Sequence, residues 1–247
     1  MLAFTRNTVI VVLLTMLSQL GGIAWLIALL FKRRILVFSG AHIVLTVATL
    51  WIAPVFGRVP ITCGAGGPLQ MQSWFYCALN RQYVAPELRD VAVDLAIDLE
   101  TVFPGTVTLA LDGNFPFVSG FPLLPHLSHH DGRKLDIAFF YKDASGYKPS
   151  ATRSPIGYFA FEDGPTQCPQ AWLTLRWDLK WLQPFWKKME LEPERMVATI
   201  NWLAKEPRVG KVFLEPHLLD RYGVSHPKFR FQGCRAARHD DHFHIQL

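Results

Sequence analysis

Acidic residues and cysteines are both missing from the first 56 residues of the chain, whose only charged side chains are Arg6 and the run Lys32-Arg33-Arg34. Residues 57–247 hold the other 21 of the 25 basic residues together with all 20 acidic ones. The net charge of +5 therefore arises almost wholly from the N-terminal segment. Because a nucleic-acid-binding domain normally carries a basic excess of its own, we expect no nucleic-acid partner. Internal repeats and low-complexity tracts are also absent, which excludes a repeat architecture.

Cysteine is scarce, and no Cys-x-x-Cys pair occurs, which argues against a structural zinc site made of thiolates. The four cysteines, Cys63, Cys77, Cys168 and Cys234, all follow the N-terminal segment. An even number outside the membrane is typical of disulfides in an oxidising compartment. Of the three possible pairings we favour Cys63–Cys77 with Cys168–Cys234, which would tether a central loop near the C-terminal histidines. Buried free thiols are the alternative.

Two long apolar runs fill the N-terminal segment. Val9 to Phe31 contains 23 uncharged residues and Ile35 to Phe56 contains 22, each more than the roughly 20 that a membrane-spanning helix needs. The three basic residues between the runs favour a turn that faces the cytoplasm. We therefore expect residues 1–56 to form a transmembrane helical hairpin with both chain termini outside. The alternative is one span plus an amphipathic or re-entrant segment, because Gly21-Gly22 and Pro54 can bend either run.

The remaining chain has the length of one domain. We expect a linker and a disulfide-closed loop over 57–84, followed by a domain over 85–247. Apolar spacing predicts helices over 85–102, 192–205 and 216–221, and strands over 106–111, 135–141 and 211–214. Since strands and helices do not alternate as βαβ units, the predicted class is α+β with a small mixed or antiparallel sheet.

Six of the nine histidines fall into two short stretches, three within 126–130 and three within 239–244. The chain ends in HDDHFHIQL. In an extended strand His242 and His244 share one face, and apolar residues occupy the other. Two neighbouring imidazoles on a strand suit a metal such as zinc, whereas an exposed polar strand face is the plainer interpretation.

Asp136 lies inside the apolar run Leu135 to Tyr141, which reads as a buried strand. A buried carboxylate is costly unless a cation faces it. Two histidines with one carboxylate form one of the usual catalytic zinc sets, so Asp136 is a candidate ligand. The alternative is an ion pair of Asp136 with Arg133 or Lys134.

The stretches HLSHHDGRKLDI and HDDHFHIQL resemble, in that order, the two zinc motifs of the penicillin-insensitive murein endopeptidases. These belong to the metallopeptidase group that also includes lysostaphin-type, D-alanyl-D-alanine and hedgehog-type members. The resemblance covers roughly residues 100–247 and is loose between the motifs. Two motifs in the right order are more specific than either alone.

The resemblance implies one Zn²⁺ per chain, bound by His129, Asp136 and His244. It also implies that His242 is the catalytic base. His239 and His126 fall at motif positions near the metal, where they would stabilise an oxyanion or support the ligands.

Asp241 is an alternative base, because a related branch of the group uses an acidic residue three positions before its last zinc histidine. Strand alternation predicts that the Asp241 side chain points away from His242 and His244, so we favour His242.

Residue patterns alone indicate a zinc hydrolase outside the cytoplasm. With the resemblance, we expect a membrane-anchored zinc peptidase that hydrolyses stem peptides or cross-links of peptidoglycan, as a DD-endopeptidase or DD-carboxypeptidase. Its domain would face the periplasm or cell exterior from the bacterial inner membrane. One alternative is a non-catalytic zinc module of the same fold that binds wall peptide or a partner. Another is a membrane-complex component in which the hairpin is the functional part.

Overall fold

The computed structural model describes residues 2–169 and 173–247. Its N-terminal part consists of α1 (Leu2–Ser18), α2 (Gly21–Ala28), α3 (Arg34–Ile52) and the short 3₁₀ helix η1 (Ala53–Phe56). Among the described residues, one helical stretch, Arg34–Phe56, is long and apolar enough to cross a membrane. The apolar helix in the preceding run is shorter.

The expected single span over 9–31 is not a continuous helix. The chain leaves α1 at Ser18, takes a left-handed conformation at Gln19 with φ of 60°, and starts α2 at Gly21. The two glycines explain the break, because α2 folds back closely against α1. A Cβ atom on Gly21 would lie 2.8 Å from the Leu14 carbonyl oxygen. Glycine therefore permits a close approach that larger residues would prevent.

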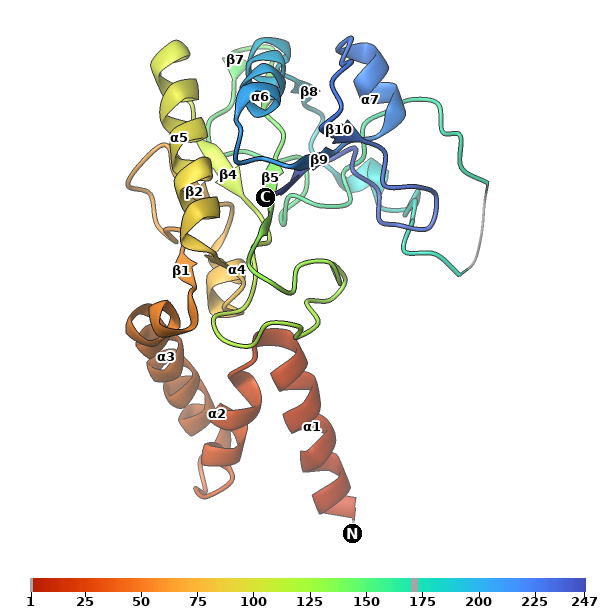
Figure 1. Cartoon of the computed structure of the whole chain (residues 1–247). Helices are drawn as coiled ribbons and strands as arrows, with labels where there is room; N and C mark the ends of the chain where they lie inside the picture. The colour runs from red at the N-terminus through yellow and green to blue at the C-terminus, as the bar shows by residue number, and fades with distance from the viewer. Residues whose placement is uncertain (1, 170–172) are drawn as a thin grey trace.

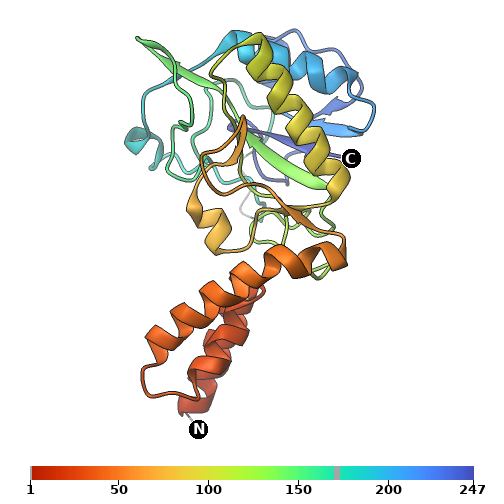
Figure 2. The same cartoon turned by 90° about the vertical axis from the view of Figure 1, so that its left-hand side faces the viewer.

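The helices consequently make three passes instead of two (Figures 1 and 2). α1 runs towards the main domain, α2 runs away from it, and α3 returns. The N-terminus lies at the end far from the domain, as does the turn of residues 29–33 between α2 and α3 (Figure 1). The structure thus differs from the expected hairpin, which placed both chain termini on one side.

Six strands form the main sheet, in the order β10, β9, β11, β5, β4, β2. They are β2 (Leu69–Met71), β4 (Thr108–Ala110), β5 (Lys134–Ala138), β9 (Lys211–Phe213), β10 (Phe229–Arg230) and β11 (His242–Gln246). β11 runs antiparallel to both neighbours, whereas β2 pairs parallel with β4 and β10 parallel with β9. The predicted α+β class with a mixed sheet is confirmed.

The other strands form two small sheets, β1 (Val59–Pro60) with β3 (Tyr83–Val84), and β6 (Tyr141–Asp143) between β7 (Gly146–Tyr147) and β8 (Glu190–Leu191). The remaining helices are α4 (Trp74–Ala78), α5 (Pro86–Val102), η2 (Gln183–Phe185), α6 (Pro193–Lys205) and α7 (Pro216–Arg221). The helices predicted at 85–102, 192–205 and 216–221 are therefore present, each with proline at its start.

The apolar core lies on one face of the central strands. α5 and α6 lie beside each other against the main sheet (Figures 1 and 2). Phe243 and Ile245 of β11 are buried in the apolar core, as are Leu135 and Ile137 of β5. Because side chains alternate along a strand, the intervening residues point to the opposite face. That face carries the histidines and Asp136.

Two disulfides close the structure, Cys63–Cys77 and Cys168–Cys234. This is the pairing expected from the sequence. Cys168 belongs to the long segment between β7 and β8, and Cys234 to the connection between β10 and β11. The second bridge therefore joins two loops that flank the histidine-bearing face.

Candidate metal centre

Three side chains converge where β5 pairs with β11. The register sets His244 opposite Asp136, and both are buried. Asp136 Oδ1 lies 2.7 Å from His244 Nδ1 and 3.3 Å from His129 Nε2, and the two nitrogens are 3.1 Å apart. Ligands of a tetrahedral zinc with bonds of about 2.0–2.1 Å are about 3.3 Å from one another. The spacing of these atoms is close to that of a zinc ligand set.

His129 reaches this position from the loop of residues 115–133, here named the histidine loop. Its Nδ1–H donates to the carbonyl oxygen of Gly113 at 2.8 Å. Because a carbonyl oxygen only accepts, the proton of neutral His129 resides on Nδ1. The lone pair on Nε2 is then free to face Asp136 and His244. Such a bond to the outer nitrogen is usual for metal-binding histidines.

The second carboxylate oxygen of Asp136 is held by Tyr158. The Tyr158 hydroxyl donates to Asp136 Oδ2 at 2.6 Å and accepts from the backbone N–H of Asp112 at 3.2 Å. Tyr158 thereby turns Oδ1 towards the histidines. Sequence reasoning missed this residue, since it lies in a segment without strand or helix periodicity.

His126 lies beside a second buried carboxylate. Its Nδ1 is 3.0 Å from Asp112 Oδ2 and 3.3 Å from Asp136 Oδ2. Arg81 engages Asp112 through two bonds, of 2.5 and 2.8 Å, which holds the pKa of Asp112 at about 2 despite its burial. Asp112 was also missed, although a carboxylate at the end of the apolar stretch 107–111 could have indicated a buried acidic group.

His242 comes from the same strand face as His244, as predicted. Its Nδ1 lies 2.5 Å from Asp241 Oδ1, and its Nε2 lies 3.6 Å from Asp136 Oδ1. The expectation that Asp241 points away from His242 is wrong, because Asp241 precedes β11 and its backbone does not follow strand alternation. Asp241 instead fixes the outer nitrogen of His242, and the inner one faces the metal centre.

Charge is unevenly distributed among the buried histidines. Burial alone would raise the pKa of Asp136, but the imidazoles of His129, His242 and His244 hold it well below its ordinary value. Burial lowers the pKa of His244 to about 4, against the attraction of Asp136. Burial likewise disfavours charge on His242, yet Asp136 and Asp241 together raise its pKa to about 9. Several imidazoles thus surround one carboxylate, and their mutual repulsion prevents all of them from being protonated at once.

His239 completes the cluster, with its ring centroid 5.0 Å from that of His242 and 5.3 Å from that of His244. Burial, followed by repulsion from His242 and His244, holds the pKa of His239 well below its usual range. A protonated His239, which the sequence interpretation invoked as an oxyanion donor, is therefore disfavoured. Its neutral ring still offers one N–H.

The alternative cations for Asp136 lie elsewhere. Lys134 Nζ pairs with Asp131 at 2.7 Å, and Arg133 Nη1 lies 3.5 Å from Glu87. Neither basic residue neutralises Asp136, so the simple ion-pair interpretation is wrong.

A small cavity of about 220 Å³ opens onto these side chains. Its walls come from the histidine loop, through Leu127, and from the connection between β10 and β11, through Ala236 and Ala237. Leu175 closes another side, and its N–H donates to the carbonyl oxygen of Arg235 at 3.0 Å. The Cys168–Cys234 bridge anchors these same loops, as the sequence suggested.

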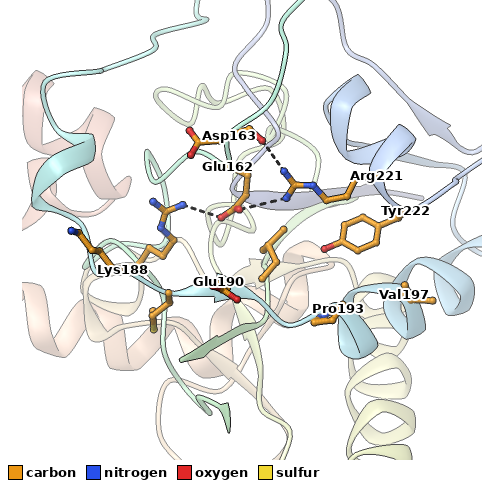
Figure 3. A pocket seen from close by; sticks show the side chains of 11 residues that line it. Glu162, Asp163, Lys188, Glu190, Pro193, Val197, Arg221 and Tyr222 are labelled. Carbon is orange, nitrogen blue, oxygen red and sulfur yellow. Dashed lines mark hydrogen bonds and ion pairs between the residues drawn. The ribbon is translucent and has the colours of Figure 1, made fainter. Parts of the chain in front are cut away.

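A larger hollow of about 740 Å³, named here the charged hollow, has none of these histidines in its lining (Figure 3). Glu162 at its centre pairs with Arg153 at 2.9 Å and with Arg221 at 3.8 Å. Arg221 also donates to the carbonyl oxygen of Asp163 at 2.7 Å. Because arginine charges neutralise its central carboxylate, this hollow offers no comparable ligand set. Among the described residues, two neighbouring groups have ligand atoms close enough together to hold a metal ion: His126, His129 and Asp136, and His239, His242 and His244.

Comparison with known proteins adds no further identification. No protein-family model matches the chain, and no curated protein shows significant similarity to it. The resemblance to murein endopeptidases therefore rests on the two sequence motifs.

Proposed function

We propose that the protein is a membrane-anchored, zinc-dependent peptidase that hydrolyses peptide bonds of peptidoglycan. The observation that supports this most directly is the convergence of His129 Nε2, Asp136 Oδ1 and His244 Nδ1, with His242 Nε2 close to the same oxygen. One nucleophile-activating group beside three ligands is the minimal set for metal-assisted hydrolysis.

The donor set fits zinc. Two imidazole nitrogens and one carboxylate oxygen are ligands that zinc accepts in catalytic sites. Asp136 is fully buried and has no lysine or arginine partner within the part of the chain that the structure describes. When bound by His129, Asp136 and His244, zinc would polarise a peptide carbonyl and lower the pKa of water.

His242 is placed to move the proton. Asp241 holds its Nδ1–H, so the Nε2 lone pair faces the cavity once the ring is neutral. A zinc ion bound by Asp136 would favour that neutral form, because it would offset the carboxylate charge that raises the pKa of His242. There it can accept a proton from an attacking water and later return that proton to the leaving amine. The N–H of neutral His239, beside His242, is a candidate donor to the oxyanion that develops on the carbonyl.

Location supports the same proposal. A helix able to span a membrane precedes the domain, and both disulfides suit an oxidising compartment outside the cytoplasm. The substrate class comes from the motif resemblance.

Metal analysis of the full-length protein in detergent, combined with digestion of purified muropeptides, tests the proposal. We expect about one zinc per chain, loss of cleavage after chelation, and recovery on adding zinc. A protein that binds no metal contradicts the proposal outright. A protein that holds zinc but cleaves no muropeptide is the non-catalytic module.

A further inference from the structure

The histidine loop rests directly on the N-terminal helices. The Phe117 N–H donates to Gln19 Oε1, between α1 and α2, at 3.3 Å. The Phe117 ring lies 5.1 Å from that of Phe56 in η1. Arg58, just after η1, donates to Ser119 Oγ at 2.8 Å. Figure 1 shows this loop immediately above the domain end of α1. The loop that supplies His129 therefore lies between the domain and the apolar helices.

The same side of the domain exposes large apolar side chains. On the histidine loop, Val118 is 56% exposed, Leu124 is 49% exposed and Leu127 is 48% exposed. η1 and α4 contribute further exposed residues of the same kind: Val55, Phe56, Trp74 and Phe75. α4 itself is bound to the middle of α3, since His42 Nε2 lies 2.8 Å from the Ala78 carbonyl oxygen. The apolar surface of α3 thus continues onto the domain.

This composition fits the boundary region of a bilayer. Tryptophan and other aromatic side chains gather where a membrane meets water, and exposed apolar side chains next to a spanning helix are costly in water alone. The four basic residues of the N-terminal segment are Arg6 in α1, Lys32 and Arg33 in the turn between α2 and α3, and Arg34 at the start of α3. These parts of the helices lie at the end away from the domain (Figure 1). The helix bundle is therefore asymmetric, with one cationic end and one apolar end that adjoins the domain.

Leu127 connects this surface with the cavity. It is half exposed and also lines the cavity in which Asp136 and His244 lie. His126 and Ser128, on either side of it in sequence, line the cavity as well. The mouth of the candidate site consequently borders the apolar surface.

We propose that the metal centre opens at the bilayer surface and acts on peptides carried by a lipid anchor in the same membrane. The reaction in this proposal rests on the proposed function, whereas the position of the site at the bilayer does not. A lipid-anchored peptide would approach along the membrane and meet the cavity at the Leu127 edge. Diffusion in two dimensions would raise its effective concentration there.

Position is tested first, without reference to metal or activity. Val118→Cys and Val102→Cys provide a matched pair, since Val102 is 65% exposed and lies at the end of α5 on the far side of the domain (Figure 1). All four native cysteines are in disulfides, so a thiol-reactive fluorophore labels only the introduced one. In nanodiscs with lipids brominated near the headgroup, we expect strong quenching at residue 118 and little at residue 102. Equal, weak quenching at both positions would overturn the proposal.

Substrate preference is tested with one muropeptide presented in two forms, free in solution or attached to a lipid anchor in the nanodisc that holds the protein. We expect the anchored form to be cleaved at least about 10-fold faster at equal bulk concentration. Leu124→Ser should reduce that advantage and leave cleavage of the free peptide unchanged, and Val102→Ser should affect neither. Equal rates on both forms would refute the lipid-anchored substrate. If neither form is cleaved, the proposed function fails and this substrate with it, while the quenching result still decides where the site lies.

Discussion

The candidate metal centre around Asp136 and the charged hollow are two buried charged clusters. A hydrogen bond of 2.9 Å from the Glu162 N–H to the Asp240 carbonyl oxygen joins the stretches of chain that carry them. In the charged hollow, Glu162 faces the guanidinium groups of Arg153 and Arg221 (Figure 3). In the metal centre, Asp136 faces only imidazoles and one tyrosine hydroxyl.

This difference separates a carboxylate that the protein neutralises with arginine from one that is left to titratable imidazoles. Arginine is charged at every accessible pH, so the charged hollow is neutralised by the protein itself. Imidazoles are neutral for much of the pH range and leave lone pairs in place, so the cluster around Asp136 is completed only by protons or by a metal ion. The charged hollow, although larger, is therefore the weaker candidate for a metal site.

The largest effect is expected from removing a metal ligand. Replacing His129, Asp136 or His244 by Ala should abolish nearly all bound zinc and nearly all muropeptide cleavage together, because three ligands are the minimum for a catalytic site. Zinc content by elemental analysis and cleavage by chromatography are the measurements. His130→Ala is the matched control, since His130 is an exposed neighbour of His129 outside the cluster. Full zinc content in Asp136→Ala would show that the metal lies elsewhere.

The next effect separates His242 from the ligands. His242→Ala should keep close to one zinc per chain and lower the rate about 100- to 10,000-fold, which is the usual cost of losing a general base. The paired measurement is zinc content against kcat.

Asp241→Ala is the comparison for His242. It should be milder, because Asp241 only orients the ring of His242 through Nδ1. A His242→Ala protein without zinc would mean that His242 is a ligand, and Asp241 would become the first candidate for the base.

Tyr158→Phe tests the support of Asp136. Losing the bond from the tyrosine hydroxyl to Asp136 Oδ2 should weaken zinc affinity about 10- to 100-fold, as is typical when an outer partner of a metal ligand is removed. Competition with a chelator of known affinity gives the value. Tyr222→Phe is the matched control, because Tyr222 lines the charged hollow. Equal effects of the two substitutions would contradict the assigned role of Tyr158.

The smallest effect on zinc is expected in the charged hollow. Glu162→Gln should leave zinc content and cleavage within about 2-fold, because it removes a charge that arginine already neutralises. It should lower the free energy of unfolding by about 1–3 kcal/mol, since Arg153 loses its buried partner. Denaturant unfolding monitors stability. A loss of zinc in Glu162→Gln would break the contrast between the two clusters.

Much of the candidate site could be predicted because its signals are local. Strand alternation places His242 and His244 on one face, and an aspartate inside an apolar run has to meet a partner. The even cysteine count and their position after the apolar runs indicated the disulfides. Short-range patterns of this kind survive folding because β5 and β11 are central strands whose register is fixed by the core.

The rest depends on contacts between distant segments. Tyr158 contacts Asp136 from an irregular loop, and the periodicity of the sequence cannot predict such a contact. The direction of the Asp241 side chain was predicted wrongly, because strand alternation was assumed for a residue that precedes β11. The first apolar run was read as one helix because hydropathy does not reveal the close packing of Gly21 against Leu14. Each failure lies where tertiary packing decides the local conformation.

The central position of β11 sets the order in which the protein can be made. β11 lies between β5 and β9, and it follows every other described strand in the sequence. During synthesis, at about 5–20 residues per second, the earlier strands emerge with a vacant place in the middle of their sheet. The sheet can close only after residue 246 has been synthesised. A chain truncated before β11 would therefore lack both the centre of the main sheet and His244.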